Sequence, residues 1–376
     1  MRPLTSLTTS TIAAMIALLS STGPAAAQEA STPQWSLDAD HFDASRIWQL
    51  STGKGVVVAV VDTGVDAHHP DLAGRILPGA DFTGTAADGR VDTSSNGHGT
   101  SVAGIIAGNP GRADGVTGLA PGASIMPVRI SIDLAADPAV LAQGIDYAAT
   151  HGAKVINISS ATPILNPQVR SAVDEAFRND IVVVAAAGND GQLGNPAEYP
   201  AALPGVIAVA ATDNTNTRWP KSETGPYLGL SAPGVDIYTT STQGSRITTT
   251  GTSFAAPQVA ATAALLRARY PDENAAQIIA RLTTTAHGGS TGRDAQQGYG
   301  LIDPFRALTA PEPAAAVTNP LLQPMAPVEK TSAAGQHRSP ASSIIIGGVA
   351  AVVAAAMAAA FIIRRRNAAR RPRKAA

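Results

Sequence analysis

The chain has 376 residues and no cysteine, which excludes disulfide bonds, zinc sites built from thiolates and cysteine nucleophiles. Its formal net charge is −1, but eight of the 27 basic residues lie outside residues 28–343. Residues 28–343 therefore contain 19 basic residues and all 28 acidic residues, and their formal net charge is −9. This negative charge argues against nucleic-acid binding.

The first 27 residues have the organisation of a secretory signal peptide. Arg2 is followed by an apolar stretch at 12–19 and then by three alanines at 25–27, a small-residue cleavage pattern. We expect cleavage after Ala27, with an uncleaved anchor as the alternative. The next parts are then an N-terminal extension and a globular domain, at residues 28–50 and 51–309.

Short, almost wholly apolar runs alternate with segments of helical period along the globular domain. The runs are typical of strands buried on both faces, and they lie at 55–61, 124–130, 153–158, 181–186 and 206–211. Helices are expected between them at 100–107, 138–151 and 169–180. The alternation predicts an α/β fold with a doubly wound, mostly parallel sheet and helices on both faces. Functional groups should lie just past the carboxyl ends of the strands.

Two polar residues stand where this pattern changes. Asp62 directly follows an apolar run and precedes Thr63-Gly64, and a carboxylate there is costly unless a partner meets it. Asp-Thr-Gly alone also suits half of an aspartic protease site, but that site needs a second such motif in a β-rich chain, and the sequence has none. His98 lies between two glycines just before a helical pattern, and a single histidine in such a place is more often structural than catalytic.

Two more residues each have a structural and a functional interpretation. Asn189 follows a buried run, either as a turn residue or as a side-chain donor at the carboxyl end of a strand. Ser253 stands at the start of a long helical pattern that extends to Tyr270. It is either an N-cap or a nucleophile, because the free N–H groups and positive end of a helix favour a developing anion.

Taken together, these segments resemble the subtilisin-like serine proteases (subtilases). Three blocks occur in that family's order: 60–65 (Val-Val-Asp-Thr-Gly-Val), 96–104 (Asn-Gly-His-Gly-Thr-Ser-Val-Ala-Gly) and 251–257 (Gly-Thr-Ser-Phe-Ala-Ala-Pro). The resemblance implies a serine endopeptidase acting on protein or peptide substrates, with Asp62, His98 and Ser253 as its catalytic triad. It also implies an oxyanion hole formed by Asn189 and the backbone N–H of Ser253.

The resemblance further implies a substrate-binding edge, and here the sequence departs from the family. Substrate would lie as an added strand near Ser159, Ser160 and Ala161, with Gly188 as a further binding residue. Many subtilases continue with Leu-Gly-Gly after the serine that matches Ser159, whereas this chain has Ser160-Ala161-Thr162. A Cβ at Ala161 would narrow the entrance of the S1 pocket or shift the strand, so we expect restricted specificity.

The resemblance also raises the questions of a folding prodomain and of bound metal ions. Residues 28–50 are too few for the separate folding prodomain that secreted subtilisins carry, so we expect them to pack along the protease. The pair His68-His69 could suggest a metal site, but the family has a similar His-Pro-Asp-Leu loop, and we interpret the pair as a surface turn. Structural calcium is common in the family, although no ligand set can be matched here, and no other cofactor is expected.

The C-terminal part has the composition of a stalk, a membrane span and a tail. Residues 310–343 hold six prolines and predict an extended stalk. Residues 344–363 carry no charge, and a helix of that length reaches about 30 Å, the thickness of a bilayer core. The basic tail 364–376 begins with three arginines, so the positive-inside rule places it in the cytoplasm and the acidic body outside.

The whole layout is similar to that of the mycosins, the membrane-anchored proteases of actinobacterial type VII secretion systems. Segment 47–55 (Ile-Trp-Gln-Leu-Ser-Thr-Gly-Lys-Gly) is also mycosin-like. The resemblance implies a single-pass protein of the cell membrane, with its catalytic domain extracytoplasmic and a type VII secretion membrane complex as a partner. An alternative is a structural stabiliser of that complex with secondary protease activity. A general nutrient-degrading protease fits poorly with a membrane tether.

Overall fold

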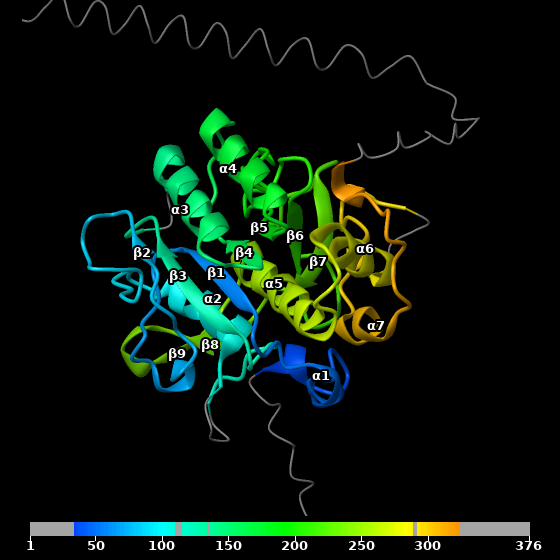
Figure 1. The fold of residues 1–376 in the computed structure, drawn as a ribbon, viewed down its shortest axis with the longest axis horizontal. Helices are drawn as coiled ribbons and strands as arrows, with labels where there is room; N and C mark the ends of the chain where they lie inside the picture. Colours follow the sequence, from blue (N-terminus) through cyan, green and yellow to red (C-terminus); the bar gives the residue numbers. More distant parts are fainter. Residues whose placement is uncertain (1–33, 110–114, 134–135, 289–291, 323–376) are drawn as a thin grey trace, which may run out of the picture. The chain divides into compact units, whose positions relative to one another are not determined.

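A sheet of nine strands forms the centre of the protein in the computed structural model, which describes residues 34–109, 115–133, 136–288 and 292–322 (Figure 1). The strands are β1 (Val57–Asp62), β2 (Ala80–Asp81), β3 (Ser124–Arg129), β4 (Val155–Ile158), β5 (Val182–Ala186), β6 (Ile207–Thr212), β7 (Leu228–Pro233), β10 (His287–Gly288) and β11 (Gly300–Leu301). Their order is β10-β11-β7-β6-β5-β4-β1-β3-β2.

The sheet is parallel except at one edge, where β10 pairs with β11 in antiparallel fashion. After β1 the chain adds β2 and β3 on one side, and then β4 to β7 on the other. The order therefore reverses next to β1, and ligands of such sheets bind outside the carboxyl ends of strands at this point. This arrangement confirms the predicted doubly wound, mostly parallel α/β fold.

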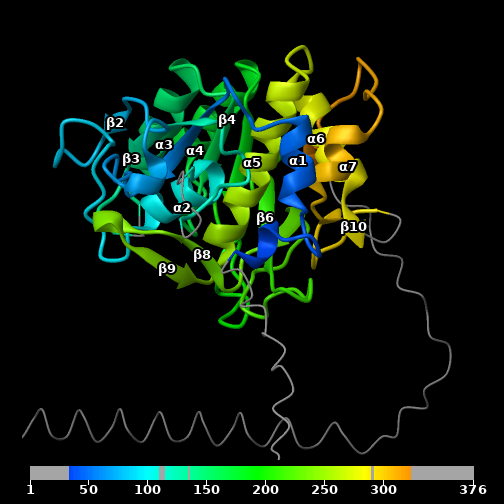
Figure 2. The same cartoon turned by 90° about the horizontal axis from the view of Figure 1, so that it is seen from below.

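Helices cover both faces of the sheet (Figures 1 and 2). Val58 and Val60 belong to the core shared with α2 and α5, whereas Ala59 and Val61 face the core shared with α3 and α4. This alternation is what a strand buried on both sides requires. The helices are α1 (Ala44–Leu50), α2 (His98–Ala107), α3 (Pro138–Thr150), α4 (Pro167–Arg178), α5 (Thr252–Arg269), α6 (Ala275–Thr285) and α7 (Pro304–Thr309).

All five predicted strands are present, with ends that differ from the expected ones by no more than two residues. The helix expected at 169–180 begins earlier, because the Asn166 side chain accepts hydrogen bonds from the N–H groups of Gln168 and Val169 and a proline takes the first position. β7 and the hairpin formed by β8 (Ile237–Thr240) and β9 (Arg246–Thr249) were not predicted from the sequence.

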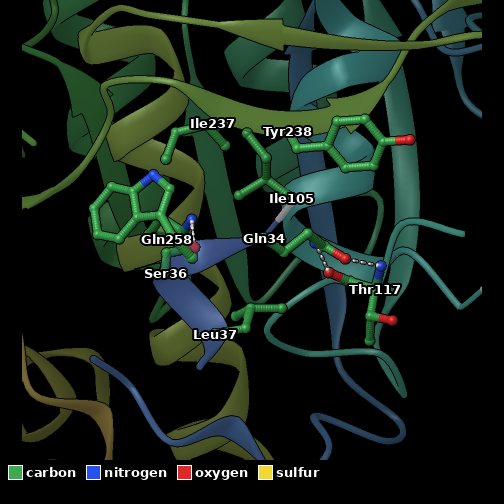
Figure 3. A pocket seen from close by; sticks show the side chains of 9 residues that line it. Gln34, Ser36, Leu37, Ile105, Thr117, Ile237, Tyr238 and Gln258 are labelled. Atoms are coloured by element: carbon green, nitrogen blue, oxygen red, sulfur yellow. Dashed lines mark hydrogen bonds between the residues drawn. The ribbon is translucent and has the colours of Figure 1, made fainter. Parts of the chain in front are cut away.

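The N-terminal segment is bound to the domain surface by specific contacts. The side-chain amide of Gln34 forms two hydrogen bonds with the backbone of Thr117 (Figure 3). Gln34 Nε2 donates to Thr117 O at 2.6 Å, and the N–H of Thr117 donates to Gln34 Oε1 at 2.9 Å. Trp35 Nε1 donates to the carbonyl of Val235 at 3.2 Å. Further along, Trp48 Nε1 donates to Leu119 O at 3.0 Å, and α1 lies beside α7 (Figure 2). Residues 34–50 are thus part of the folded body.

Part of the expected stalk also lies against the domain. Asn319 Nδ2 donates to Gly205 O at 2.9 Å, and Leu321 is 3% exposed. Within the described ranges, none of the helices has the length and hydrophobicity that a membrane span needs. The expected signal peptide (1–27), membrane helix (344–363) and basic tail (364–376) lie outside the described residues.

Candidate active site

A histidine and an aspartate meet at the carboxyl end of β1. Asp62 is the last residue of β1, and its Oδ1 lies 2.8 Å from Nδ1 of His98, the first residue of α2. The same oxygen accepts the N–H of Thr63 at 2.7 Å, while Oδ2 is buried and has no hydrogen-bond partner in the part of the chain that the structure describes. The two side chains are 0% and 3% exposed, so water competes little for the bond.

Glycine lets the start of α2 come close to β1. A Cβ on Gly99 would lie 2.1 Å from the carbonyl oxygen of Gly64 and 3.2 Å from the Cβ of Asp62. The helix also begins at His98, two residues before the predicted start, because Gly97 takes a positive φ of +62° just before it. Small residues around His98 therefore bring its imidazole within reach of Asp62.

A second carboxylate, Asp92, holds the same region together, and the sequence analysis did not identify it. Its Oδ1 accepts the hydroxyl of Thr63 at 3.1 Å, and its Oδ2 accepts the N–H and hydroxyl of Thr100 at 3.0 and 2.7 Å. Burial lowers the pKa of His98, but the charge and hydrogen bond of Asp62, together with the charge of Asp92, outweigh burial. The pKa of His98 is therefore raised above its ordinary value.

Ser253 is the second residue of α5, and two hydrogen bonds join it to Ser159. Its Oγ donates to Ser159 O at 3.2 Å, and its carbonyl accepts the Ser159 hydroxyl at 2.9 Å. That carbonyl has no helical partner because Pro257, four residues on, lacks an N–H. The loop after β4 is thereby fixed to the start of α5. The ring of Phe254 lies 5.3 Å from the His98 ring, which places the start of α5 beside the histidine.

Asn189 lies past the end of β5 and faces the first residue of α5. Its Oδ1 accepts both the N–H and the hydroxyl of Thr252, each at 2.9 Å. Thr252 Oγ1 in turn accepts the N–H of Gly188 at 3.1 Å. These bonds fix the amide, and among the described residues Nδ2 has no acceptor. Thr252, which the sequence analysis did not single out, therefore orients an amide donor next to Ser253.

The other expected substrate-binding residues lie around these groups. Ser159 and Ser160 follow β4, and both are buried; the Ser160 hydroxyl has no hydrogen-bond partner among the residues described. Ala161 is half-buried, and the next residue, Thr162, forms a bridge with Tyr199. Asp62, the segment from Ser159 and Asn189 thus lie at the carboxyl ends of β1, β4 and β5, respectively. This is the edge of a doubly wound sheet at which ligands bind.

The histidine pair after β1 is only partly a surface turn. The side chain of His68 is 97% exposed, but His69 is fully buried, with Nε2 2.9 Å from Ser245 O and Nδ1 accepting the N–H of Asp71. The surface interpretation is therefore wrong for His69, which connects its loop to the β9 segment. In the described part of the chain, no group of three or more His, Cys, Asp or Glu side chains is arranged to hold a metal ion.

The arrangement can perform acyl transfer. A histidine whose Nδ1 is bonded to a buried carboxylate has Nε2 available as a base. A serine in the first turn of a helix lies where backbone N–H groups favour an anion. An amide Nδ2 beside it adds a second donor. No direct Ser253–His98 hydrogen bond is present, because the serine hydroxyl donates to Ser159 O.

Comparisons with known proteins agree with this chemistry. The sequence pattern of the Subtilase family matches residues 53–300. Thermitase from Thermoactinomyces vulgaris is 37% identical over 268 residues, which cover 71% of this chain and 93% of thermitase. Among solved structures, the serine protease MycP1, an essential component of the type VII (ESX-1) secretion system, has a TM-score of 0.66 at 33% identity, covering 75% of this chain and 90% of that one. MycP1 from Mycobacterium smegmatis has a TM-score of 0.66 at 32% identity, covering 74% and 85%.

Proposed function

The chain belongs to the subtilase family of serine endopeptidases, and from this premise we propose that it cleaves peptide bonds with Ser253, His98 and Asp62. The observation that carries the proposal is the buried Asp62–His98 pair beside the first turn of α5, which holds Ser253.

In this mechanism Ser253 Oγ forms a bond to the carbonyl carbon of the substrate, and His98 Nε2 takes the hydroxyl proton. Asp62 holds the imidazole with its proton on Nδ1 and stabilises the imidazolium. As the peptide C–N bond breaks, the imidazolium gives its proton to the leaving amine. Water then attacks the carbonyl carbon of the acyl-enzyme and gives its proton to His98. The bond to Ser253 Oγ breaks, Oγ takes that proton from His98, and the carboxylic acid product leaves.

The oxyanion of each tetrahedral intermediate would be stabilised by two donors, Asn189 Nδ2 and the backbone N–H of Ser253. The bonds from Thr252 to Asn189 Oδ1 support this role, because they fix the amide before substrate arrives. Substrate would pair with the backbone of residues 159–161, and Gly188 would be a further binding residue. A side chain at Ala161 instead of glycine supports a narrow range of cleavage sites.

We infer further that the protease is anchored in the cell membrane, with its catalytic domain extracytoplasmic and its C-terminus cytoplasmic. The uncharged segment 344–363 and the basic tail behind it support this, as does the signal-like N-terminus. The full chain should sediment with membranes, and deletion of residues 344–376 should release the protease. A chain that stays soluble at full length contradicts the anchoring.

The similarity to MycP1 supports a role in processing substrates of a type VII secretion system. The alternative, a structural stabiliser of the secretion membrane complex, makes a different prediction. Secretion should be lost in a Ser253→Ala strain if proteolysis is required. Secretion that is lost only when the whole protein is deleted makes the stabilising role dominant.

Peptide hydrolysis by the purified full chain tests the enzymatic part directly. Ser253→Ala should remove hydrolysis of a peptide library, whereas Ser45→Ala, which changes an exposed serine on α1, should leave it unchanged. Cleavage after only a few residue types is expected. Equal cleavage across the library would contradict the restricted S1 pocket.

A further inference from the structure

A fully buried glutamate lies against the turn that carries Asn189. Glu223 is 0% exposed, and its backbone N–H donates to Gly188 O at 3.1 Å. Its side-chain Oε1 is 3.4 Å from the N–H of Asp190, on the other side of Asn189. Glu223 therefore contacts the residues directly before and after the candidate oxyanion donor.

The fit between Glu223 and the turn depends on glycine. A Cβ on Gly188 would lie 2.4 Å from the carboxyl carbon of Glu223 and 2.4–2.5 Å from both of its oxygens. Gly188 also has a positive φ of +119°, which side-chain-bearing residues rarely adopt. The backbone of the turn and the carboxyl group of Glu223 thus pack directly against each other.

The turn is held from two sides. On one side, Thr252 at the start of α5 bonds to Gly188 and Asn189. On the other side lies the segment 221–223, in which Lys221 O accepts the N–H of Gly191 at 2.9 Å. This segment is itself fixed to the sheet, because Ser222 Oγ accepts the N–H of Ala211 in β6 at 3.2 Å.

We propose that Glu223 is a positioning residue for catalysis: its carboxylate holds the Gly188–Asp190 turn so that Asn189 Nδ2 points at the oxyanion. The inference rests on the proposed function of Asn189. In this role Glu223 acts through Asn189 and is not itself a catalytic residue.

The protonation of Glu223 should affect this role near neutral pH. Burial and the charge of Glu198, with that of Asp190, raise the pKa of Glu223 to about 7, although the bonds from Asp190 N–H and Tyr227 act in the opposite direction. Asp190, Glu198 and Tyr227 are the titratable groups that face it. Below pH 7 the group becomes a carboxylic acid, which is a weaker acceptor for the N–H of Asp190.

Glu223→Gln keeps the size of the side chain and removes its charge. We expect kcat on a peptide anilide at pH 8.5 to fall about three- to tenfold with KM within about twofold, because the turn loses a charged acceptor. In the wild-type protein both His98 and Glu223 take up a proton as pH falls, so kcat should fall below pH 7 more steeply than it would with one titrating group. In Glu223→Gln the fall should fit a single titrating group, and the two profiles should converge at low pH. Glu175→Gln, which changes a partly exposed carboxylate on α4, is the matched control and should change neither value.

Thermal unfolding distinguishes a role of Glu223 in positioning Asn189 from a role in stabilising the fold only. A raised pKa in the folded state means that Glu223 stabilises the protein below its unfolded pKa, and that this stability is lost as pH rises through about 7. Glu223→Gln should therefore raise Tm at pH 8.5 while lowering kcat. A fall in both Tm and kcat would indicate a structural role only and overturn the proposal.

Two further variants make the outcome decisive. In an Asn189→Ala background, Glu223→Gln should cause no further loss of kcat; an equal loss there would show that Glu223 does not act through Asn189. Glu198→Gln removes the neighbouring charge and should move the titration of Glu223 in the kcat profile to lower pH. This readout does not require altering Glu223. If Asn189→Ala keeps full kcat, the proposed oxyanion role fails first. If it is crippled while Glu223→Gln and Glu198→Gln both keep the wild-type profile, only the present inference fails.

Discussion

Nδ1 of His98 lies 2.8 Å from Oδ1 of Asp62, and the two residues come from the first turn of a helix and the last position of a strand. Both side chains are almost fully buried, and the Asp62 oxygen is also held by the N–H of Thr63. This bond fixes the imidazole ring and leaves Nε2 available to Ser253.

Asp62→Asn should keep the fold but remove the charge that fixes the imidazole tautomer. We expect kcat to fall by about 10⁴, as it does when the aspartate of a serine protease triad becomes asparagine. The matched control is Asp272→Asn, which changes an exposed aspartate just after α5. Steady-state kinetics on a peptide anilide measure the effect. A loss of less than about tenfold would show that Asp62 does not orient the base.

Asn189→Ala should reduce kcat by about 10²–10³ with little change in KM, because its donor serves the oxyanion rather than bound substrate; a subtilisin that loses its side-chain donor behaves in this way. Asn189→Asp is the sharper variant. It keeps an oxygen for the N–H and hydroxyl of Thr252 but removes the Nδ2 donor. Its kcat should fall at least as far. If purified Asn189→Asp keeps full kcat, the oxyanion assignment is wrong.

The acid limb of kcat/KM should report His98. Because Asp62 and Asp92 raise the pKa of His98 against the effect of burial, the half-maximal point should lie above the ordinary value of about 6.5. Protonated His98 cannot take the proton of Ser253, so activity is lost as pH falls through this pKa. The profile is best measured in Glu223→Gln, which removes the second titration. There, Asp92→Asn should move the limb to lower pH, and an unmoved limb would contradict the contribution of Asp92.

A buried ion pair formed by Glu273 and Arg281 should matter more for stability than a solvent-accessible one. Arg281 Nε lies 2.7 Å from Oε2 of Glu273, and the side chains are 2% and 6% exposed. Glu273→Ala leaves the guanidinium buried without its partner and should lower the free energy of unfolding by about 3–5 kcal/mol. The solvent-accessible pair Glu175–Arg178 is the control, and Glu175→Ala should lower the free energy of unfolding far less, because water and salt screen such a pair. Urea unfolding of both variants gives the comparison.

The sequence was most informative where local pattern determines structure. The apolar runs predicted five strands of the sheet because residues buried on both faces are apolar whichever way they point. Strand ends and helix starts drew attention to Asp62, His98, Asn189 and Ser253, but each remained ambiguous until the three sequence blocks were compared with the subtilases. Their meeting at one edge follows from the parallel topology, which brings the carboxyl ends of β1, β4 and β5 together.

Contacts between segments far apart in the chain could not be predicted in this way. Asp92 joins Thr63 to Thr100, and Thr252 contacts Asn189 across 63 residues, yet each is an ordinary polar residue in its local sequence. Glu223 stands between Ser222 and Thr224 in a polar stretch that suggests a surface loop, but the structure buries it completely. His69 was misjudged for the same reason, since its burial depends on the distant carbonyl of Ser245.

Labelling with a fluorophosphonate tests the central claim most directly, because the probe forms a covalent bond only with an activated serine. After labelling the full chain at pH 8.5, mass spectrometry of its peptides should locate one adduct, on Ser253. The Ser253→Ala protein should carry none and should hydrolyse no peptide. An adduct on another serine, or hydrolysis that persists in Ser253→Ala, would contradict the assignment of Ser253 as the nucleophile.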